Sequence, residues 1–197
     1  FIGFMEETNK KIPNFFVVGA ARSGTTSLYN YLKQHPEVYL SPIKEPHYFC
    51  KDIDTSKFIG PFRKDRDFNY KKYLKGDMKN VIHQSWIKEE DQYLKLFKNV
   101  KDEKAIGEVS VMYLLSKVAA KEIYKFNPNA KIIIILREPV ERAFSHYKMD
   151  KNDGVTKESI LELTKKYNSK DAKYGTRSLC LEFSAYYEQV KRYFDVF

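Results

Sequence analysis

The apolar residues of the chain gather in short runs, and the strongest run is Lys-Ile-Ile-Ile-Ile-Leu at residues 131–136. A continuous β-branched run without a polar face predicts a central strand of a parallel sheet, covered on both sides. Residues 14–18 and 105–109 are further apolar runs of strand length, and each predicts another buried strand.

Between the strands, apolar residues recur at the three- and four-residue spacing of helices. Helices are expected over residues 25–33, 88–98, 112–126 and 178–194, with another beginning at Pro139. Three prolines within residues 36–50 predict a loop. The alternation predicts an α/β fold with a mostly parallel sheet flanked by helices. Because a further strand normally follows such a last helix, we expect one domain over residues 1–197 that is incomplete at its C-terminal end.

Composition narrows the class of protein. The 197 residues are 43% hydrophobic and 15% aromatic, enough for a core and too apolar for a disordered chain. No apolar run approaches the roughly 18 residues that a membrane span needs. Cys50 and Cys180 are too few for a disulfide framework and leave either free thiols or one bridge open. The net charge of +9 favours an anionic ligand, which can be a nucleic acid, a nucleotide or an acidic glycan.

A glycine-containing turn, Gly-Ala-Ala-Arg-Ser-Gly-Thr-Thr, lies at residues 19–26 between the first strand and the first helix. Its backbone N–H groups and the positive end of the helix dipole make a cradle for an anion. The spacing of Gly19 and Gly24 matches a nucleoside triphosphate loop, but Thr25 stands where that loop carries lysine. Arg22 places the positive charge inside the turn instead, which favours a shorter, diphosphate-like group.

A second basic residue, Arg137, directly follows the strand expected at 131–136. Ligands of open α/β sheets bind at the carboxyl ends of the strands, where an arginine can hold a phosphate through two hydrogen bonds. A salt bridge from Arg137 to Glu138 or Glu141 is the alternative, and the sequence leaves both interpretations open. Arg142, farther along the same helix, is expected on its solvated face.

The two segments resemble the sulfotransferases that use 3′-phosphoadenosine 5′-phosphosulfate (PAPS), especially the branch with heparan sulfate sulfotransferases and their bacterial relatives. In that P-loop fold a loop G-x-x-[KR]-[ST]-G-T-[TS] holds the 5′-phosphosulfate. An arginine after a strand, with a serine eight residues later, holds the 3′-phosphate. The resemblance therefore implies that the donor is bound by Arg22, Ser23, Gly24, Thr25, Thr26, Ser27, Arg137 and Ser145. Because arginine does not readily release a proton, Arg22 is expected to act as an electrostatic clamp.

The segment Lys44-Glu-Pro-His-Tyr-Phe49 resembles the K-E-P-H-[FY]-F segment of the same branch, whose glutamate is regarded as the base that deprotonates the acceptor. The resemblance implies that Glu45 is this base. It further implies that His47 orients the substrate or shares the proton, and that Lys44 steadies the sulfate.

Residues 106–114 resemble the family segment G-E-K-[ST]-P-x-Y-[LF] and imply acceptor contacts for Glu108 and Ser110. Val109 and Val111 replace the lysine and proline of that pattern. This departure weakens the inference that heparan sulfate is the acceptor of this chain.

The sequence thus predicts an enzyme that moves a sulfuryl group from PAPS to a hydroxyl or amine, with a carbohydrate as one candidate acceptor and PAP as product. Arg22, Glu45 and His47 are the predicted catalytic residues, and no metal is expected because no His/Cys/Asp cluster has ligand spacing. The alternatives are a nucleotide kinase or NTPase, which Thr25 and Arg137 disfavour, and a basic nucleic-acid-binding module, which the scattered lysines disfavour.

The expected partners are the donor nucleotide and a small-molecule or glycan acceptor, with no nucleic acid and no membrane within this segment. Residues 51–80 and 150–177 are expected to form the acceptor side. The sequence leaves the acceptor and the oligomeric state open, and the compartment too: cytoplasm for a bacterial enzyme, Golgi lumen for a eukaryotic glycan-modifying one.

Overall fold

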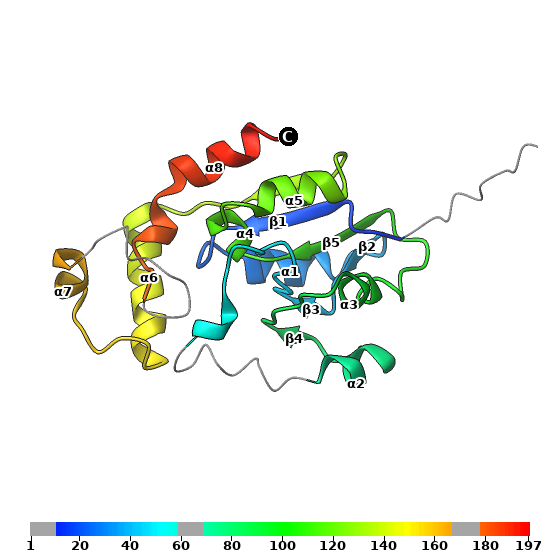
Figure 1. Cartoon of the computed structure of the whole chain (residues 1–197), viewed down its shortest axis with the longest axis horizontal. Helices are drawn as coiled ribbons and strands as arrows, with labels where there is room; N and C mark the ends of the chain where they lie inside the picture. The colour runs from blue at the N-terminus through cyan, green and yellow to red at the C-terminus, as the bar shows by residue number, and fades with distance from the viewer. Residues whose placement is uncertain (1–10, 59–68, 167–177) are drawn as a thin grey trace, which may run out of the picture.

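A parallel four-stranded sheet forms the centre of the computed structural model, which describes residues 11–58, 69–166 and 178–197 (Figure 1). The strand order is β2-β5-β1-β6. The strands are β1 (Phe15–Gly19), β2 (Val38–Leu40), β5 (Ala105–Val109) and β6 (Lys131–Ile134). All three pairings within this sheet are parallel, so the predicted α/β fold is confirmed.

The side chains of β1 alternate between two apolar clusters, one on each face of the sheet. Phe16 and Val18 share a cluster with residues of α3 (Glu90–Lys95), α4 (Met112–Leu115), α5 (Ala119–Phe126) and α8 (Tyr186–Phe194). Phe15 and Val17 pack in the other cluster with residues of α1 (Thr25–Leu32). Because both faces are covered, the strand contains only apolar residues and glycine.

The central position predicted for residues 131–136 is wrong. Within the described ranges β6 pairs with β1 alone and forms an edge of the sheet. None of its four residues is fully buried, whereas every residue of β1 is buried. An apolar run indicates that both faces of a strand are covered, but it does not indicate whether the strand has a neighbouring strand on each side.

A second, two-stranded parallel sheet lies beside the first and consists of β3 (Ile43–Lys44) and β4 (Ile82–His83). Both β2 and β3 fall in the region 36–50, which the sequence predicts as a loop. The prolines of this region flank the short strands and do not interrupt them. The small sheet places residues 43–45 next to residues 82–85.

The helix predicted over 112–126 is divided into α4 and α5 by a polar side chain. Ser116 Oγ accepts hydrogen bonds from the backbone N–H groups of Val118 (3.2 Å) and Ala119 (3.1 Å) and donates to Asp52 (2.6 Å). It therefore satisfies the N–H groups at the start of α5. The helix predicted over 178–194 is regular only in α8, after a 3₁₀ turn at Glu182–Ser184.

The helix expected to begin at Pro139 is α6 (Pro139–Asn152), and the Glu138 carboxylate caps it by accepting from the N–H groups of Val140 and Glu141. The remaining helices are α2 (Tyr70–Lys75) and α7 (Ile160–Lys165). Across the described ranges, no helix combines the length and apolarity of a membrane span. Cys50 and Cys180 are both buried free thiols, so the bridge that the sequence left open is not formed.

Parts of the predicted acceptor side, residues 59–68 and 167–177, lie outside the described residues. The expectation that the domain is incomplete at its C-terminal end stays a prediction.

Candidate active site

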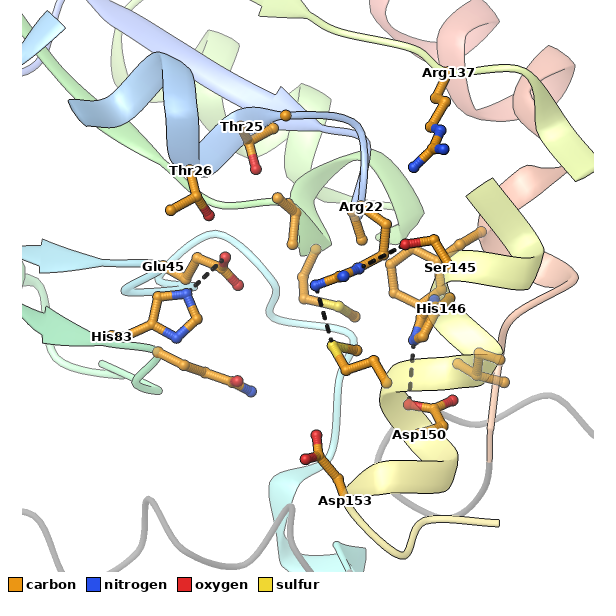
Figure 2. Close-up of a pocket in the computed structure, with 18 of the residues that line it drawn as sticks. Arg22, Thr25, Thr26, Glu45, His83, Arg137, Ser145, His146, Asp150 and Asp153 are labelled. Atoms are coloured by element: carbon orange, nitrogen blue, oxygen red, sulfur yellow. Dashed lines mark hydrogen bonds and ion pairs between the residues drawn. The ribbon is translucent and has the colours of Figure 1, made fainter. Parts of the chain in front are cut away.

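A cavity of about 610 Å³ lies where the glycine-containing turn after β1 meets α6 and the small β3–β4 sheet (Figure 2). Its size suits a small-molecule ligand. Its wall includes the turn at 21–26, Glu45, the pair His83 and Gln84, and the inner face of α6 with Arg137 before it. The cavity therefore joins all three of the sequence motifs singled out for donor binding and proton removal.

The turn supplies the positive end of a helix to this cavity. Gly24 is the residue before α1 and has φ 93°, a left-handed conformation that favours glycine. No side chain caps the helix, its first turn has no acidic residue, and Gly24, Thr25 and Thr26 line the cavity. The first N–H groups of a helix have no acceptor within the helix, so this wall favours an anion. Ser23 and Ser27, predicted to share this role, do not line the cavity.

Arg22 connects the turn to α6. Its Nε donates to Ser145 Oγ at 3.2 Å, and its Nη1 approaches the Met149 sulfur at 3.6 Å (Figure 2). The sequence assigns Arg22 to the 5′-phosphosulfate and Ser145 to the 3′-phosphate. The structure brings the two side chains into contact, so Arg22 lies between the two predicted anion sites.

Arg137 also faces the cavity, and its guanidinium is engaged by Glu141. The Glu141 Oε2 atom accepts from Nη2 at 3.0 Å and from Nε at 3.2 Å. The salt bridge that the sequence left open is thus present. The two side chains are 42% and 63% exposed, so the pair is weak and a phosphate can displace the carboxylate.

Glu45 forms the opposite wall and is surrounded by basic groups. Its Oε1 accepts from Lys44 Nζ at 2.6 Å and lies 3.6 Å from His83 Nε2, while its Oε2 lies 3.5 Å from His47 Nε2. Burial opposes ionisation, but the rings of His47 and His83 and the charge of Lys44 outweigh it and hold the pKa of Glu45 well below its ordinary value. Glu45 is therefore a carboxylate at neutral pH, as a proton acceptor must be.

The base loop, residues 44–47, is fixed from both sides. The Glu45 N–H donates to the Val109 carbonyl at 2.8 Å, and the Ser85 N–H donates to the Glu45 carbonyl at 2.9 Å. His47 Nδ1 lies 2.8 Å from the Ser85 carbonyl, which can only accept, so this nitrogen carries a proton and Nε2 faces Glu45. His47 is thus placed to share a proton with Glu45, as the sequence predicts.

Glu108 and Ser110 lie beneath the base loop and do not reach the cavity. Both are fully buried, and neither lines the cavity. Ser110 Oγ accepts from the His47 N–H (3.3 Å) and donates to Glu108 Oε2 (3.1 Å). The two residues thus support the loop that carries Glu45, and the acceptor contact implied for them stays a prediction. Lys44 is also buried and absent from the cavity wall, and it holds Glu45 in place of a sulfate.

The expectation that Arg142 lies on the solvated face of its helix is wrong, because its side chain is fully buried. It donates to Ser184 Oγ (2.7 Å) and to the Cys180 carbonyl, and its Nη1 lies 3.0 Å from His146 Nδ1. Burial, with the charges of Arg142 and Arg22, lowers the pKa of His146 to about 3. His146 is therefore neutral, and the network ties the segment after residue 177 to the helix that carries Ser145.

Several residues of the cavity wall were not found from the sequence. Met149 on α6 and Asp153 just after that helix follow Ser145 at intervals of four residues, so helical spacing could have indicated them. His83 and Gln84 carry no such signal, because a two-residue strand places them.

Comparison with known proteins shows the family of this chain. Residues 13–183 match the Sulfotransferase family, so the chain belongs to this family. Human carbohydrate sulfotransferase 15 is 32% identical over 164 residues, which cover 69% of this chain and 27% of that protein. The bifunctional heparan sulfate N-deacetylase/N-sulfotransferase 1 of Caenorhabditis briggsae is 25% identical over 98% of this chain and 20% of its own length. The chain spans less than a third of these curated relatives.

Among solved structures, a sulfotransferase from Alicyclobacillus acidocaldarius superposes with a TM-score of 0.72 and 37% sequence identity, covering 94% of this chain and 69% of that one. The resemblance read from the motifs is therefore confirmed at the level of family and fold. Of the three functions that the sequence allows, the family assignment favours sulfuryl transfer.

Proposed function

We propose that this chain transfers a sulfuryl group from PAPS to a hydroxyl or amine acceptor, with carbohydrates as the first acceptor class to test. One observation carries the proposal: a single cavity has an anion-binding wall and, facing it, an ionised buried carboxylate. The family assignment supports the reaction class.

The residues present fit the donor. The start of α1, Arg22, Arg137 and Ser145 offer N–H, guanidinium and hydroxyl donors to a group with two separate anionic parts. The donor supplies the activated sulfuryl group. The chain's own contribution is to position it and to balance the charge that develops on the leaving oxygen.

Glu45 accepts the proton of the acceptor in this mechanism. Its ionised state makes it ready to do so, and Lys44 holds one of its two oxygens in place. His47 Nε2 is placed to take a share of this proton, since no other group is hydrogen-bonded to it within the described residues.

The donor assignment is tested by Arg137→Ala, with calorimetry of PAP and of adenosine 5′-monophosphate. Loss of a charged hydrogen-bond donor to the 3′-phosphate is expected to weaken PAP binding by about 10- to 100-fold. Binding of the monophosphate, which has no 3′-phosphate, is expected to change little. Lys148→Ala is the matched control, because it removes an exposed cation from α6, the helix that follows Arg137, outside the cavity.

Equal losses for both nucleotides in Arg137→Ala would contradict the 3′-phosphate assignment. Transfer itself is measured with labelled PAPS and a panel of methyl glycosides, amino sugars and phenols. Failure of the wild-type chain to bind PAP, or to transfer sulfate to any member of this panel, would contradict the proposed function.

A further inference from the structure

The small sheet brings a histidine to the base from a distant part of the sequence. Lys44 and His83 are partners in the β3–β4 pairing, and the Gln84 N–H extends this pairing by donating to the Lys44 carbonyl at 2.7 Å. In Figure 2 His83 lies beside Glu45, across the cavity from Arg22 and Ser145. Its side chain is 64% exposed, so it is accessible to a ligand.

The hydrogen bonds of Lys44 determine which nitrogen of His83 carries the proton. Lys44 Nζ lies 2.6 Å from Glu45 Oε1 and 3.2 Å from His83 Nε2. An ammonium group can only donate, so a neutral His83 ring accepts at Nε2 and carries its proton on Nδ1, and a charged ring carries a proton on Nδ1 as well.

Since Nε2 is directed at Lys44 and Glu45, Nδ1 is the ring nitrogen left to offer a hydrogen bond to a ligand in the cavity that His83 lines. Because His83 lines the cavity beside the proposed base, it is within reach of a group that Glu45 would deprotonate.

We propose that His83 binds the acceptor, with Nδ1–H donating a hydrogen bond to an acceptor oxygen that neighbours the group deprotonated by Glu45. This inference rests on the proposed function, because it needs the acceptor in this cavity. The acceptor class is then a vicinal diol or an amino alcohol, as found in sugars.

The proton balance leaves His83 unchanged. The O–H or N–H bond of the acceptor breaks and its proton moves to Glu45. A new bond forms between the acceptor atom and sulfur, and the bond from sulfur to the nucleotide oxygen breaks. His83 keeps its Nδ1 proton throughout and fixes the orientation of the acceptor.

The first test needs no acceptor and no destabilising variant. The chain has four histidines, so a long-range ¹H–¹⁵N spectrum of the wild-type protein at pH 7.5 is simple enough to resolve each ring. The signals missing from His83→Asn identify His83. A ring protonated on Nδ1 is the expected result, and a ring protonated on Nε2 would overturn the proposal.

The second test measures acceptor recognition. An acceptor found with the panel above is compared with its analogue that lacks the neighbouring oxygen. In wild-type protein the analogue is expected to lose about 2- to 10-fold in kcat/KM, the worth of one hydrogen bond. In His83→Ala the two acceptors are expected to be equal, and His83→Asn, which carries an N–H donor near the Nδ1 position, is expected to restore part of the preference.

Controls separate this inference from the function on which it rests. His35→Ala removes an exposed histidine outside the cavity and is expected to leave the preference unchanged. PAP affinity is expected to be the same in all variants. If wild-type protein transfers sulfate and His83→Ala keeps the same acceptor preference, the role of His83 is overturned while the proposed function stands. Absence of PAP binding or of transfer in the wild type would overturn the proposed function.

Discussion

The buried carboxyl of Glu108, beneath the base loop, makes the stability of this protein depend on pH. Its oxygens accept from the hydroxyls of Tyr93 (2.7 Å), Tyr113 (2.8 Å) and Ser110 (3.1 Å), which are all neutral groups. Burial raises the pKa of Glu108 from 4.5 to about 7, although these hydroxyls act in the opposite direction. The folded protein thus favours the protonated form.

The sign and size of the effect follow from this shift. A raised pKa contributes stability that is fully present below the unfolded value of 4.5 and is lost as the pH rises through about 7. At about 1.4 kcal/mol for each pKa unit, the penalty for ionising Glu108 approaches ~3 kcal/mol above pH 8 and is below ~1 kcal/mol at pH 5.

Glu108→Gln removes this penalty, because glutamine is neutral at every pH and keeps an oxygen for the tyrosine hydroxyls. We expect the variant to gain about 2–3 kcal/mol over wild type between pH 5 and pH 8.5. Urea unfolding at pH 5, 7 and 8.5, followed through the single tryptophan, measures the difference. Glu188→Gln, an exposed glutamate on α8, is the control. Wild-type and Glu108→Gln stabilities that change in parallel with pH would refute the reasoning.

Two further substitutions test the walls of the cavity. Glu45→Gln is expected to lower turnover by about 10²–10⁴-fold with little change in PAP affinity, measured by labelled-sulfate transfer and calorimetry; an active variant would move the role of base to His47 or another group. Glu141→Gln frees Arg137 from its exposed salt bridge and is expected to strengthen PAP binding by about two- to five-fold, since such pairs contribute well under ~1 kcal/mol. Unchanged or weaker PAP binding in this variant would show that Glu141 does not compete with the ligand.

The anion-binding side of the site could be predicted because its parts are contiguous in the sequence. The turn and α1 follow β1 directly, and Ser145 lies on the helix that follows Arg137. The periodicity of apolar residues locates the strands and helices, and residues that follow parallel strands lie at the same end of the sheet. No information about distant contacts is needed for this prediction. Glu45 was found in a different way, through its resemblance to a family segment, because its own region was predicted only as a loop.

The remaining features depend on contacts between distant segments, which a local pattern does not encode. His83 reaches Glu45 because two strands of two residues each pair across almost forty positions of sequence. Arg142 is buried because the segment at 178–184 packs on α6, while its charge alone predicts exposure. The position of β6 at an edge is decided by which strand lies beside it, and this is also absent from the run of isoleucines.

The backbone conformation of the cavity wall is maintained by residues that lie outside the cavity. Of the five non-glycine residues with positive φ in the described ranges, four are in or beside the cavity wall: Arg22, Glu45, His47 and Gln84. Each such conformation costs on the order of 1–3 kcal/mol and persists only when its surroundings over-determine it. Here the hydrogen bonds of Val109, Ser110 and Ser85 hold the base loop from below and from the side. Since Ser110 is in turn bound to Glu108, the orientation of Glu45 depends on a buried layer outside the cavity wall.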